Sequence, residues 1–155
     1  MKVLILYASI TGNAKGMARI LTQFFKHVGA TVTTGTMQQT DAATLADYDA
    51  VILATYTWSG GTTPEEAEDF YADLTAVDLS ARPVVFGVVG TGDPFYGDDY
   101  NTAPDLFTAA LRASGAVRGA ATVKIEQNAT DADMPAFAQF TKSVMAKLQE
   151  LHGQA

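Results

Sequence analysis

Cysteine is absent from all 155 positions of the sequence. This absence excludes disulfide bonds, thiolate nucleophiles and every zinc or iron–sulfur site that needs cysteine ligands. Any redox chemistry would therefore have to come from a bound organic cofactor. Histidine is nearly absent too: the two that occur, His27 and His152, fall near the C-terminal ends of predicted helices, where the helix dipole favours a positive charge. We interpret both as satisfied surface residues rather than as metal ligands.

Positive charge is scarce as well. Lys and Arg number 10 against 17 Asp and Glu, which gives a net charge of −7. This balance argues against binding to nucleic acid, because proteins that bind it neutralise phosphates with clustered Lys and Arg. It argues equally against an anionic membrane surface. It is compatible with electrostatic steering toward a basic protein partner.

Long hydrophobic runs are also missing. None could span a bilayer, and the apolar run in "MKVLIL" is too short for a signal peptide. We therefore expect a cytoplasmic protein. With 48% hydrophobic and 17% charged residues the chain should be globular, and its length predicts a single domain over residues 1–155.

What the sequence does contain is a regular alternation of apolar runs and helix-like segments. The runs are short and almost continuously apolar, which is typical of strands buried on both faces. Strands that alternate with helices in this way predict a parallel sheet covered by helices on both sides. The predicted strands cover residues 2–8, 30–36, 50–56, 83–89 and 116–126.

The helical segments carry recognisable start and stop signals. The first is predicted to stop at Gly29, residues 41–47 form a short helix or turn, and Thr63, Pro64 and Glu66 predict the start of the helix after the third strand. Residues spaced as on one helix face are expected to be buried. They are Met17, Ile20, Leu21, Phe24, Phe25 and Val28; Ala67, Phe70, Tyr71 and Leu74; Leu106, Phe107, Ala110 and Leu111; and Phe137, Phe140, Val144, Leu148 and Leu151.

Three unusual loops follow the first, third and fourth predicted strands, at residues 9–13, 57–61 and 90–100. Because the strands are parallel, all three loops leave the same carboxyl edge of the sheet. In open α/β sheets that edge carries the ligand site, at the point where the strand order reverses. In the order 2-1-3-4-5, this point lies between the first and third strands.

The first loop, "SITGN", leads directly into a helix, whose free N–H groups and dipole favour an anion. Gly12 allows close approach of the backbone, and Ser9, Thr11 and Asn13 can add side-chain hydrogen bonds. Taken alone, the loop reads as an ordinary capped strand–helix turn. It matches neither a Walker loop nor the Gly-x-Gly-x-x-Gly fingerprint.

The other two loops contribute aromatic residues. Trp58, the only tryptophan, stands beside two glycines, while Tyr96 and Tyr100 stand among aspartates that we interpret as turn formers because they lack metal-ligand spacing. Aromatic residues on two loops that flank a phosphate-binding loop suggest a flat ring stacked between them. A phosphate at one end and a planar ring at the other describe a mononucleotide.

The stretches "SITGNA", "TYTWSGG" and "GTGDPFY", each after its own strand, resemble those of the short-chain flavodoxins, and the resemblance covers essentially the whole chain. It implies the flavodoxin-like three-layer sandwich, with a five-stranded parallel sheet in the order 2-1-3-4-5. It also implies non-covalent binding of flavin mononucleotide (FMN). The activity implied is low-potential one-electron transfer between redox proteins rather than enzymatic turnover. Partner proteins such as reductases would dock at the acidic flavin edge of a monomer.

The resemblance also assigns roles to individual residues. The first loop would hold the FMN phosphate, Trp58 and Tyr96 would enclose the isoalloxazine ring, and the glycine-rich loops would line the ring and ribityl chain. In flavodoxins the peptide after the ring-stacking residue flips on one-electron reduction, and here that peptide joins Ser59 to Gly60. The expected FMN-binding residues are Ser9, Ile10, Thr11, Gly12, Asn13, Ala14, Thr57, Trp58, Ser59, Gly60, Gly61, Gly90, Thr91, Gly92, Asp93, Tyr96 and Tyr100.

The chain departs from the family pattern at a few positions. Ala14 replaces the usual threonine, which removes one hydroxyl donor, while Lys15 replaces an often acidic residue and can compensate electrostatically. Tyr100 competes with Tyr96 for the stacking role, although the spacing from Asp93 favours Tyr96.

Three alternative functions remain open at this point. One is an FMN-dependent NAD(P)H oxidoreductase, which would need room over the flavin ring that two stacked aromatic residues deny. Another is a flavin carrier dedicated to activating one enzyme. A phosphoryl-accepting receiver domain has the same topology, but the "ATYTW" at the end of the third strand lacks the aspartate that such a domain requires.

Overall fold

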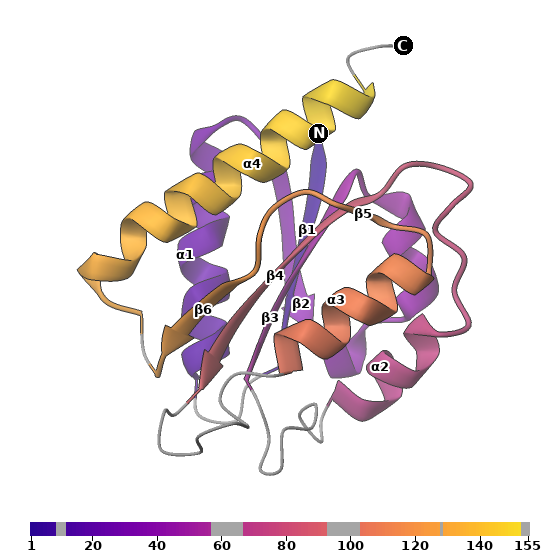
Figure 1. Ribbon diagram of the computed structural model, residues 1–155, viewed down its shortest axis with the longest axis horizontal. Coiled ribbons are helices and arrows are strands. Elements are labelled where there is room, and N and C mark those ends of the chain that lie inside the picture. Colours follow the sequence, from indigo (N-terminus) through magenta and orange to yellow (C-terminus); the bar gives the residue numbers. More distant parts are fainter. Residues whose placement is uncertain (9–11, 57–66, 93–102, 128, 153–155) are drawn as a thin grey trace.

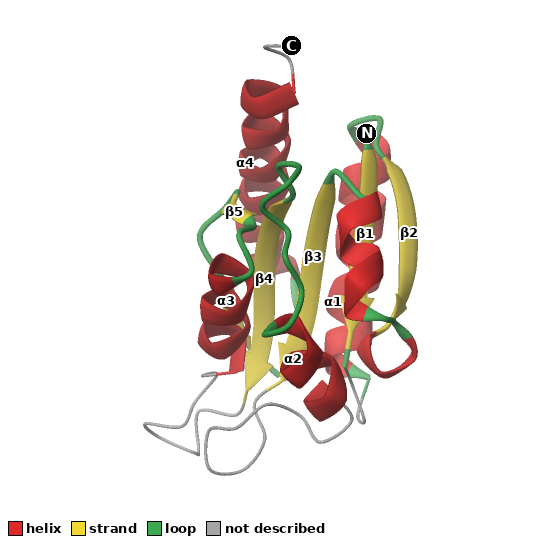
Figure 2. Cartoon of the chain, turned by 90° about the vertical axis from the view of Figure 1, so that its right-hand side faces the viewer, coloured by secondary structure: helices red, strands yellow, loops and turns green. Residues whose placement is uncertain are grey.

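The computed structural model describes residues 1–8, 12–56, 67–92, 103–127 and 129–152. Its centre is a parallel sheet in the order β2-β1-β3-β4-β5, with β6 also paired to β4. Figure 2 shows β4, β3, β1 and β2 side by side in this order. The predicted strand order is therefore confirmed. The strands are β1 (Lys2–Tyr7), β2 (Thr31–Thr36), β3 (Ala50–Tyr56), β4 (Val85–Gly92), β5 (Val117–Arg118) and β6 (Val123–Glu126).

Helices cover both faces of this sheet, as predicted (Figure 1). Helices α1 and α4 pack on one face, and α2 and α3 pack on the other. Each face has its own cluster of buried apolar residues, so the fold has three layers and two cores. The α-helices are α1 (Asn13–His27), α2 (Glu68–Leu74), α3 (Ala103–Ala113) and α4 (Met134–His152), and the short 3₁₀ helices are η1 (Met37–Gln39), η2 (Ala42–Asp47) and η5 (Asp131–Asp133).

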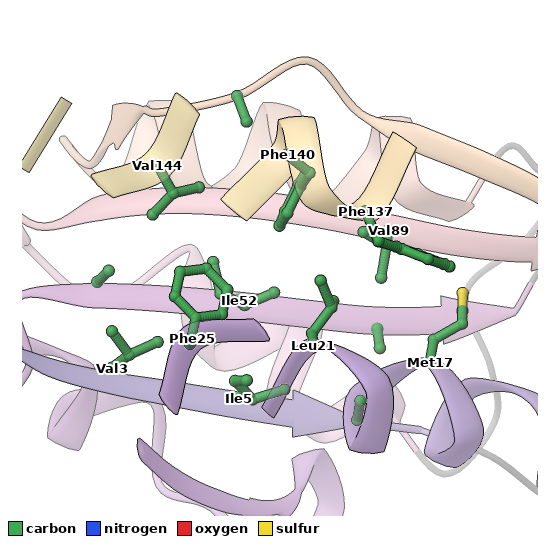
Figure 3. Packing of buried hydrophobic residues seen from close by; sticks show 14 of the residues in the cluster. Val3, Ile5, Met17, Leu21, Phe25, Ile52, Val89, Phe137, Phe140 and Val144 are labelled. Atoms are coloured by element: carbon green, nitrogen blue, oxygen red, sulfur yellow. The ribbon is translucent and has the colours of Figure 1, made fainter. Parts of the chain in front are cut away.

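The core under α1 and α4 shows how the sequence pattern becomes packing. Met17, Leu21 and Phe25 recur at helical spacing on α1, and all three are buried against the sheet. Figure 3 shows them together with side chains of α4 and of the strands that both helices cover. The burial of apolar side chains such as these is the main favourable contribution to the free energy of folding. The α4 and strand residues in the view include Val3, Ile5, Ile52, Val89, Phe137, Phe140 and Val144.

The sheet has one break that the sequence did not indicate. The single strand predicted over residues 116–126 is wrong in its middle, because the chain leaves the sheet between β5 and β6. Phe86 pairs with Arg118 and Val89 with Val123, so three steps along β4 correspond to five along its partner. The segment between Arg118 and Val123 therefore contains two extra residues. The Arg118 guanidinium stabilises this segment by donating hydrogen bonds to the Ala120 carbonyl and the Thr122 hydroxyl.

Most other predicted features are confirmed, with local corrections. Gly29 follows α1 with φ of +93°, as expected for a glycine after a helix C-terminus. Val28 was expected in the buried stripe but is 49% exposed, and Tyr71 is only half-buried. The predicted helix start at Thr63, Pro64 and Glu66 lies outside the described residues. Ile20, Phe24, Leu106 and Leu151 are also half-buried rather than buried.

The two histidines occupy the last turns of α1 and α4, as predicted. His27 is exposed, which fits a surface residue. His152 is half-buried, and its Nε2 is buried without a hydrogen-bond partner among the described residues, so the expectation of a satisfied side chain is not met there. Within the described ranges, no helix combines the length and the apolar character that a membrane crossing requires.

Candidate cofactor site

The carboxyl edge of the sheet is where β1, β3 and β4 end, at Tyr7, Tyr56 and Gly92 (Figure 1). Strand β1 is flanked by β2 on one side and by β3 on the other, so the strand order reverses between β1 and β3. A ligand crevice is expected at this reversal, because the connections from the two neighbouring strands leave toward opposite faces. The predicted site residues all belong to segments that begin at this edge.

The structure places part of the predicted site. Gly12, Asn13 and Ala14 open helix α1, and Gly90, Thr91 and Gly92 close strand β4. The remaining predicted residues lie outside the described residues, and their assignment stays a prediction. They are Ser9, Ile10, Thr11, Thr57, Trp58, Ser59, Gly60, Gly61, Asp93, Tyr96 and Tyr100.

The start of α1 has the geometry of an anion site. Gly12 precedes the helix with φ of +94°, a left-handed conformation that glycine adopts without steric cost. Its side-chain position meets nothing within 4 Å, and no side chain caps the helix there. The N–H groups of the first turn have no carbonyl partner within the helix, and the first turn contains no acidic residue. These donors and the helix dipole favour a negatively charged group at this end.

Ala14 and Lys15 differ sharply in their surroundings. The Ala14 side chain is completely buried in the core under α1, so at this position only the backbone N–H can serve a ligand. Lys15 is exposed and lines a hollow of about 240 Å³ together with Arg19 and Tyr7. Two cations thus stand one helical turn apart beside the anion-binding end of α1, which supports the electrostatic compensation predicted for Lys15.

The sequence analysis missed Arg19 and Tyr7 as neighbours of the site. The spacing of Lys15 and Arg19, four residues apart on one helix face, was the available signal. Thr34 of β2 also lines the hollow, but its proximity depends on the pairing of β2 with β1, which the sequence does not reveal residue by residue.

The end of β4 corrects one prediction. Gly90, Thr91 and Gly92 were expected in a loop, but they continue the strand and pair with β3 and with β6. Thr91 is buried, and its hydroxyl donates to the Gln127 carbonyl, while the Gln127 N–H donates to the Gly92 carbonyl at 3.0 Å. The Thr91 side chain therefore helps to fix the end of the strand, while its role toward FMN stays a prediction. The strand extends because β6 supplies a partner along its outer side.

Within the part of the chain that the structure describes, no group of three or more His, Asp or Glu side chains could hold a metal ion. The carboxyl edge thus offers backbone donors, small residues and nearby cations, at a reversal of strand order. The fold is that of a doubly wound α/β protein, an architecture in which mononucleotides bind at the carboxyl edge of the sheet.

Comparison with known proteins specifies the family. The sequence model of the flavodoxin family matches residues 5–140. The probable flavodoxin 1 of Bacillus subtilis (strain 168) is 32% identical over 146 residues, which cover 94% of this chain and 90% of that protein. The solved structure of a short-chain flavodoxin associated with a PDU bacterial microcompartment superposes with a TM-score of 0.91 and 34% identity. That superposition covers 96% of this chain and 99% of the other.

A longer relative shows the same domain in another setting. The sulfite reductase [NADPH] flavoprotein alpha-component of Vibrio vulnificus (strain CMCP6) is 32% identical over 151 residues, which cover 96% of this chain but 24% of that protein. The chain belongs to the flavodoxin family. Flavodoxins are FMN-binding electron-transfer proteins rather than enzymes, and FMN is the cofactor of this chain.

Proposed function

We propose that this protein is a single-domain, monomeric, low-potential carrier that passes one electron at a time between redox proteins of the cytoplasm. The observation that carries the proposal is the start of α1. Gly12 begins this helix in a left-handed conformation at the strand-order reversal, and the first turn contains no acidic residue that would oppose an anion. An FMN phosphate fits this end, because it is an anion that backbone donors and a helix dipole stabilise.

Different residues near the start of α1 would bind different parts of FMN. Residues 9–14 would donate hydrogen bonds to the phosphate, while Lys15 and Arg19 would add long-range attraction from the adjoining hollow. Trp58 and Tyr96 would enclose the ring and exclude water from it, with Tyr100 as the alternative stacking residue. Gly90 and Gly92 would let the ring and ribityl chain approach the backbone at the end of β4. FMN itself supplies the one-electron chemistry when it is bound.

Acidic residues supply a docking surface for a basic partner. Helix α2 follows the connection that leaves the carboxyl end of β3, and its exposed Glu68, Asp69 and Asp73 face solvent without a Lys or Arg in the helix. Asp93, Asp98 and Asp99 belong to the connection after β4. A negative field of this kind accelerates encounter with a positively charged partner and weakens with salt.

The test is a reconstitution of electron transfer. The apoprotein is loaded with FMN, its two one-electron reduction potentials are measured, and its reduction by a flavodoxin reductase is followed at low and high salt. The proposal expects two separated potentials, a reduction rate that falls as salt rises, and no oxidation of NAD(P)H by the protein alone. Direct turnover of NAD(P)H with a quinone would instead identify an oxidoreductase, and salt-independent reduction would remove the docking surface from the proposal.

A further inference from the structure

A groove runs between α1 and α4 on the outer side of these two helices. It has a volume of about 510 Å³ and is lined by the last turn of α1 and the middle and end of α4. Phe24 and Met145 pack against the core under α1 and α4, and Thr141 is buried, so the groove lies at the outer margin of this core. The lining residues are Phe24, His27, Val28, Ala138, Thr141, Lys142, Met145, Ala146 and Gln149.

The spacing and length of the groove suit the binding of another helix. At the C-terminal end of α1, Phe24, His27 and the C-cap residue Val28 have i, i+3, i+4 spacing, which is the pattern of a helix face that meets a partner helix. On α4, the lining runs from Ala138 to Gln149, which corresponds to about 17 Å or three helical turns.

The floor of this groove combines apolar contact with room for close approach. Phe24 and Met145 are half-buried, and Val28 is one of two large hydrophobic residues among those described that remain exposed. Ala138 and Ala146 are exposed and small, so a third helix could come near α4 between them.

The charge around the groove is opposite to that of the rest of the protein. Helices α1 and α4 contain only one of the seventeen acidic residues, Glu150; of their five Lys and Arg residues, Lys15 and Arg19 lie at the cofactor end of α1 rather than at the groove. Glu150 is engaged by Lys147 within α4. Lys142 and His27 line the groove, and Lys26 borders an adjoining hollow that shares Phe24 and His27. No described residue that lines the groove is acidic.

We propose that the α1/α4 groove is a docking site for an acidic amphipathic helix of a partner protein. Its apolar side chains would cover Phe24, Val28 and Met145, and its carboxylates would face Lys26 and Lys142. The complementary charge would exclude basic partners, which the acidic face around α2 attracts instead. This inference concerns a surface away from the cofactor and does not rest on the proposed redox role.

The position of the groove gives the interaction a function. Phe24 to Val28 immediately precede β2, whose first residue is Thr31, so the groove lies toward the amino edge of the sheet. The cofactor end of α1 is at the opposite edge (Figure 1). A partner seated in the groove would therefore hold the protein while leaving the carboxyl edge free for electron exchange with a second protein.

The test uses the FMN-loaded, ¹⁵N-labelled protein and a synthetic helical peptide of about four turns, with leucine at every third or fourth position and glutamate elsewhere. Backbone amide shifts should move for residues of α1 after Gln23 and of α4 after Phe137. Replacing the leucines by serine, or the glutamates by lysine, should each abolish the shifts. The double variant Lys26→Glu/Lys142→Glu should weaken the Kd by about tenfold or more.

Arg112→Glu is the matched control, because Arg112 is exposed in the last turn of α3 on the other face, as Lys26 is in the last turn of α1. Its Kd should change by less than about twofold. Ala146→Gln, which fills the groove without changing charge, should weaken binding as well. The proposal is overturned by an absence of binding up to about 1 mM, by shifts confined to the carboxyl edge, or by self-association of the free protein through this face.

Discussion

At the amino edge of the sheet, backbone hydrogen bonds join neighbouring strands where they begin, whereas the carboxyl edge carries the start of α1, whose first turn contains no acidic residue. Before β2, the Thr31 N–H donates to the Met1 carbonyl at 2.9 Å, and before β3 the Asp49 N–H donates to the Lys2 carbonyl at 2.9 Å. Asp49 also accepts from the Val85 N–H at 3.0 Å, so it links three strands. At the start of α1, the N-cap residue is Gly12, which has no side chain to cap the helix.

The difference shows that one edge of a sheet can stabilise the fold while the opposite edge binds a ligand. Backbone groups that are buried must be paired, so the self-bonded amino edge closes the fold without a ligand. N–H donors at a helix N-terminus that lack a partner lower the stability of the fold, and an anion that binds to them raises it again. Substitutions at the amino edge should therefore alter unfolding and leave FMN affinity unchanged, while those at the carboxyl edge should do the reverse. Substitutions at five positions can test whether effects on unfolding and effects on FMN affinity are separate in this way.

Gly87 is the third residue of β4 and lies between the two edges of the sheet, so a change there should affect both edges together. A Cβ at this position would clash with the buried ring of Phe140 on α4. Gly87→Ala should lower the free energy of unfolding by about 3 kcal/mol, the upper range for overpacking. Urea unfolding measures this. The double variant Gly87→Ala/Phe140→Leu should recover part of the loss, and a single variant as stable as the parent would show that the ring adapts freely.

Thr11 tests the cofactor side of the comparison. Thr11→Val keeps the shape of the side chain but removes a donor that we expect to face the FMN phosphate. Hydrogen bonds to charged groups contribute roughly 1.5–3 kcal/mol, so FMN should bind about tenfold more weakly or worse. Riboflavin, which lacks the phosphate, should bind almost as before. Equal losses for both ligands would contradict the placement of the phosphate at this loop.

Asp49 tests the amino edge. Its carboxylate accepts from the Lys2 N–H at 2.7 Å and pairs with the half-exposed Arg82. Asp49→Ala should cost about 1 kcal/mol of stability, since the ion pair is partly screened by solvent and the backbone bond carries most of the effect. The FMN Kd should not change. An Asp49→Ala protein with normal stability and weaker FMN binding would reverse the assignment of the two edges.

Gly60 tests whether the second loop takes part in reduction. If the Ser59–Gly60 peptide flips on one-electron reduction, Gly60 must reach positive φ, which costs an alanine roughly 1 kcal/mol. Gly60→Ala should then make the first reduction harder by some tens of millivolts, since about 59 mV corresponds to a tenfold change for one electron. A redox titration decides. If the potential stays constant while FMN binds more weakly in every redox state, Gly60 serves only to let the backbone pass the ring.

The smallest effect is expected at Asp78, in the turn before β4. Its side chain accepts from the Ser80 hydroxyl and from the Ser80 N–H, and these bonds hold the pKa of Asp78 below its ordinary value. The pKa of Asp78 is lower in the folded state than in the unfolded chain. The ionised carboxylate therefore stabilises the folded protein at pH values above the ordinary pKa, and this stabilisation is lost as pH falls through the lowered pKa. Ser80→Ala should raise the pKa in an NMR titration without changing FMN affinity. A pKa unchanged by the substitution would show that the backbone bond alone sets it.

Sequence patterns predicted the strand order and the bounds of β3 because a doubly buried strand is continuously apolar. They did not predict the break between β5 and β6. Gly119 packs so closely on Val85 that a Cβ would lie 2.4 Å from its Cγ1, and the residues after it, Ala120 to Thr122, leave the ladder. Such a contact depends on the neighbouring strand and leaves no local signature.

The site was predictable to a similar degree. The position of Gly12 and Asn13 at the start of α1 could be predicted from the strand–loop–helix order, because that order determines which helix end lies at the carboxyl edge. The hollow of Lys15, Arg19 and Thr34 was missed, because it brings together a helix and a strand whose register the sequence leaves open. Gly90 to Gly92 were assigned to a loop because glycine usually ends a strand, but pairing with β6 outweighs that preference.

The most direct test of the division between edges is a titration of the ¹⁵N-labelled apoprotein with FMN and, separately, with riboflavin. The account predicts one FMN per chain, clearly tighter binding of FMN than of riboflavin, and amide shifts for Gly12, Asn13 and Gly92 at the carboxyl edge. Thr31 and Asp49 at the amino edge should stay in place. Equal affinity for the two flavins, or shifts centred on Thr31 and Asp49, would contradict the account.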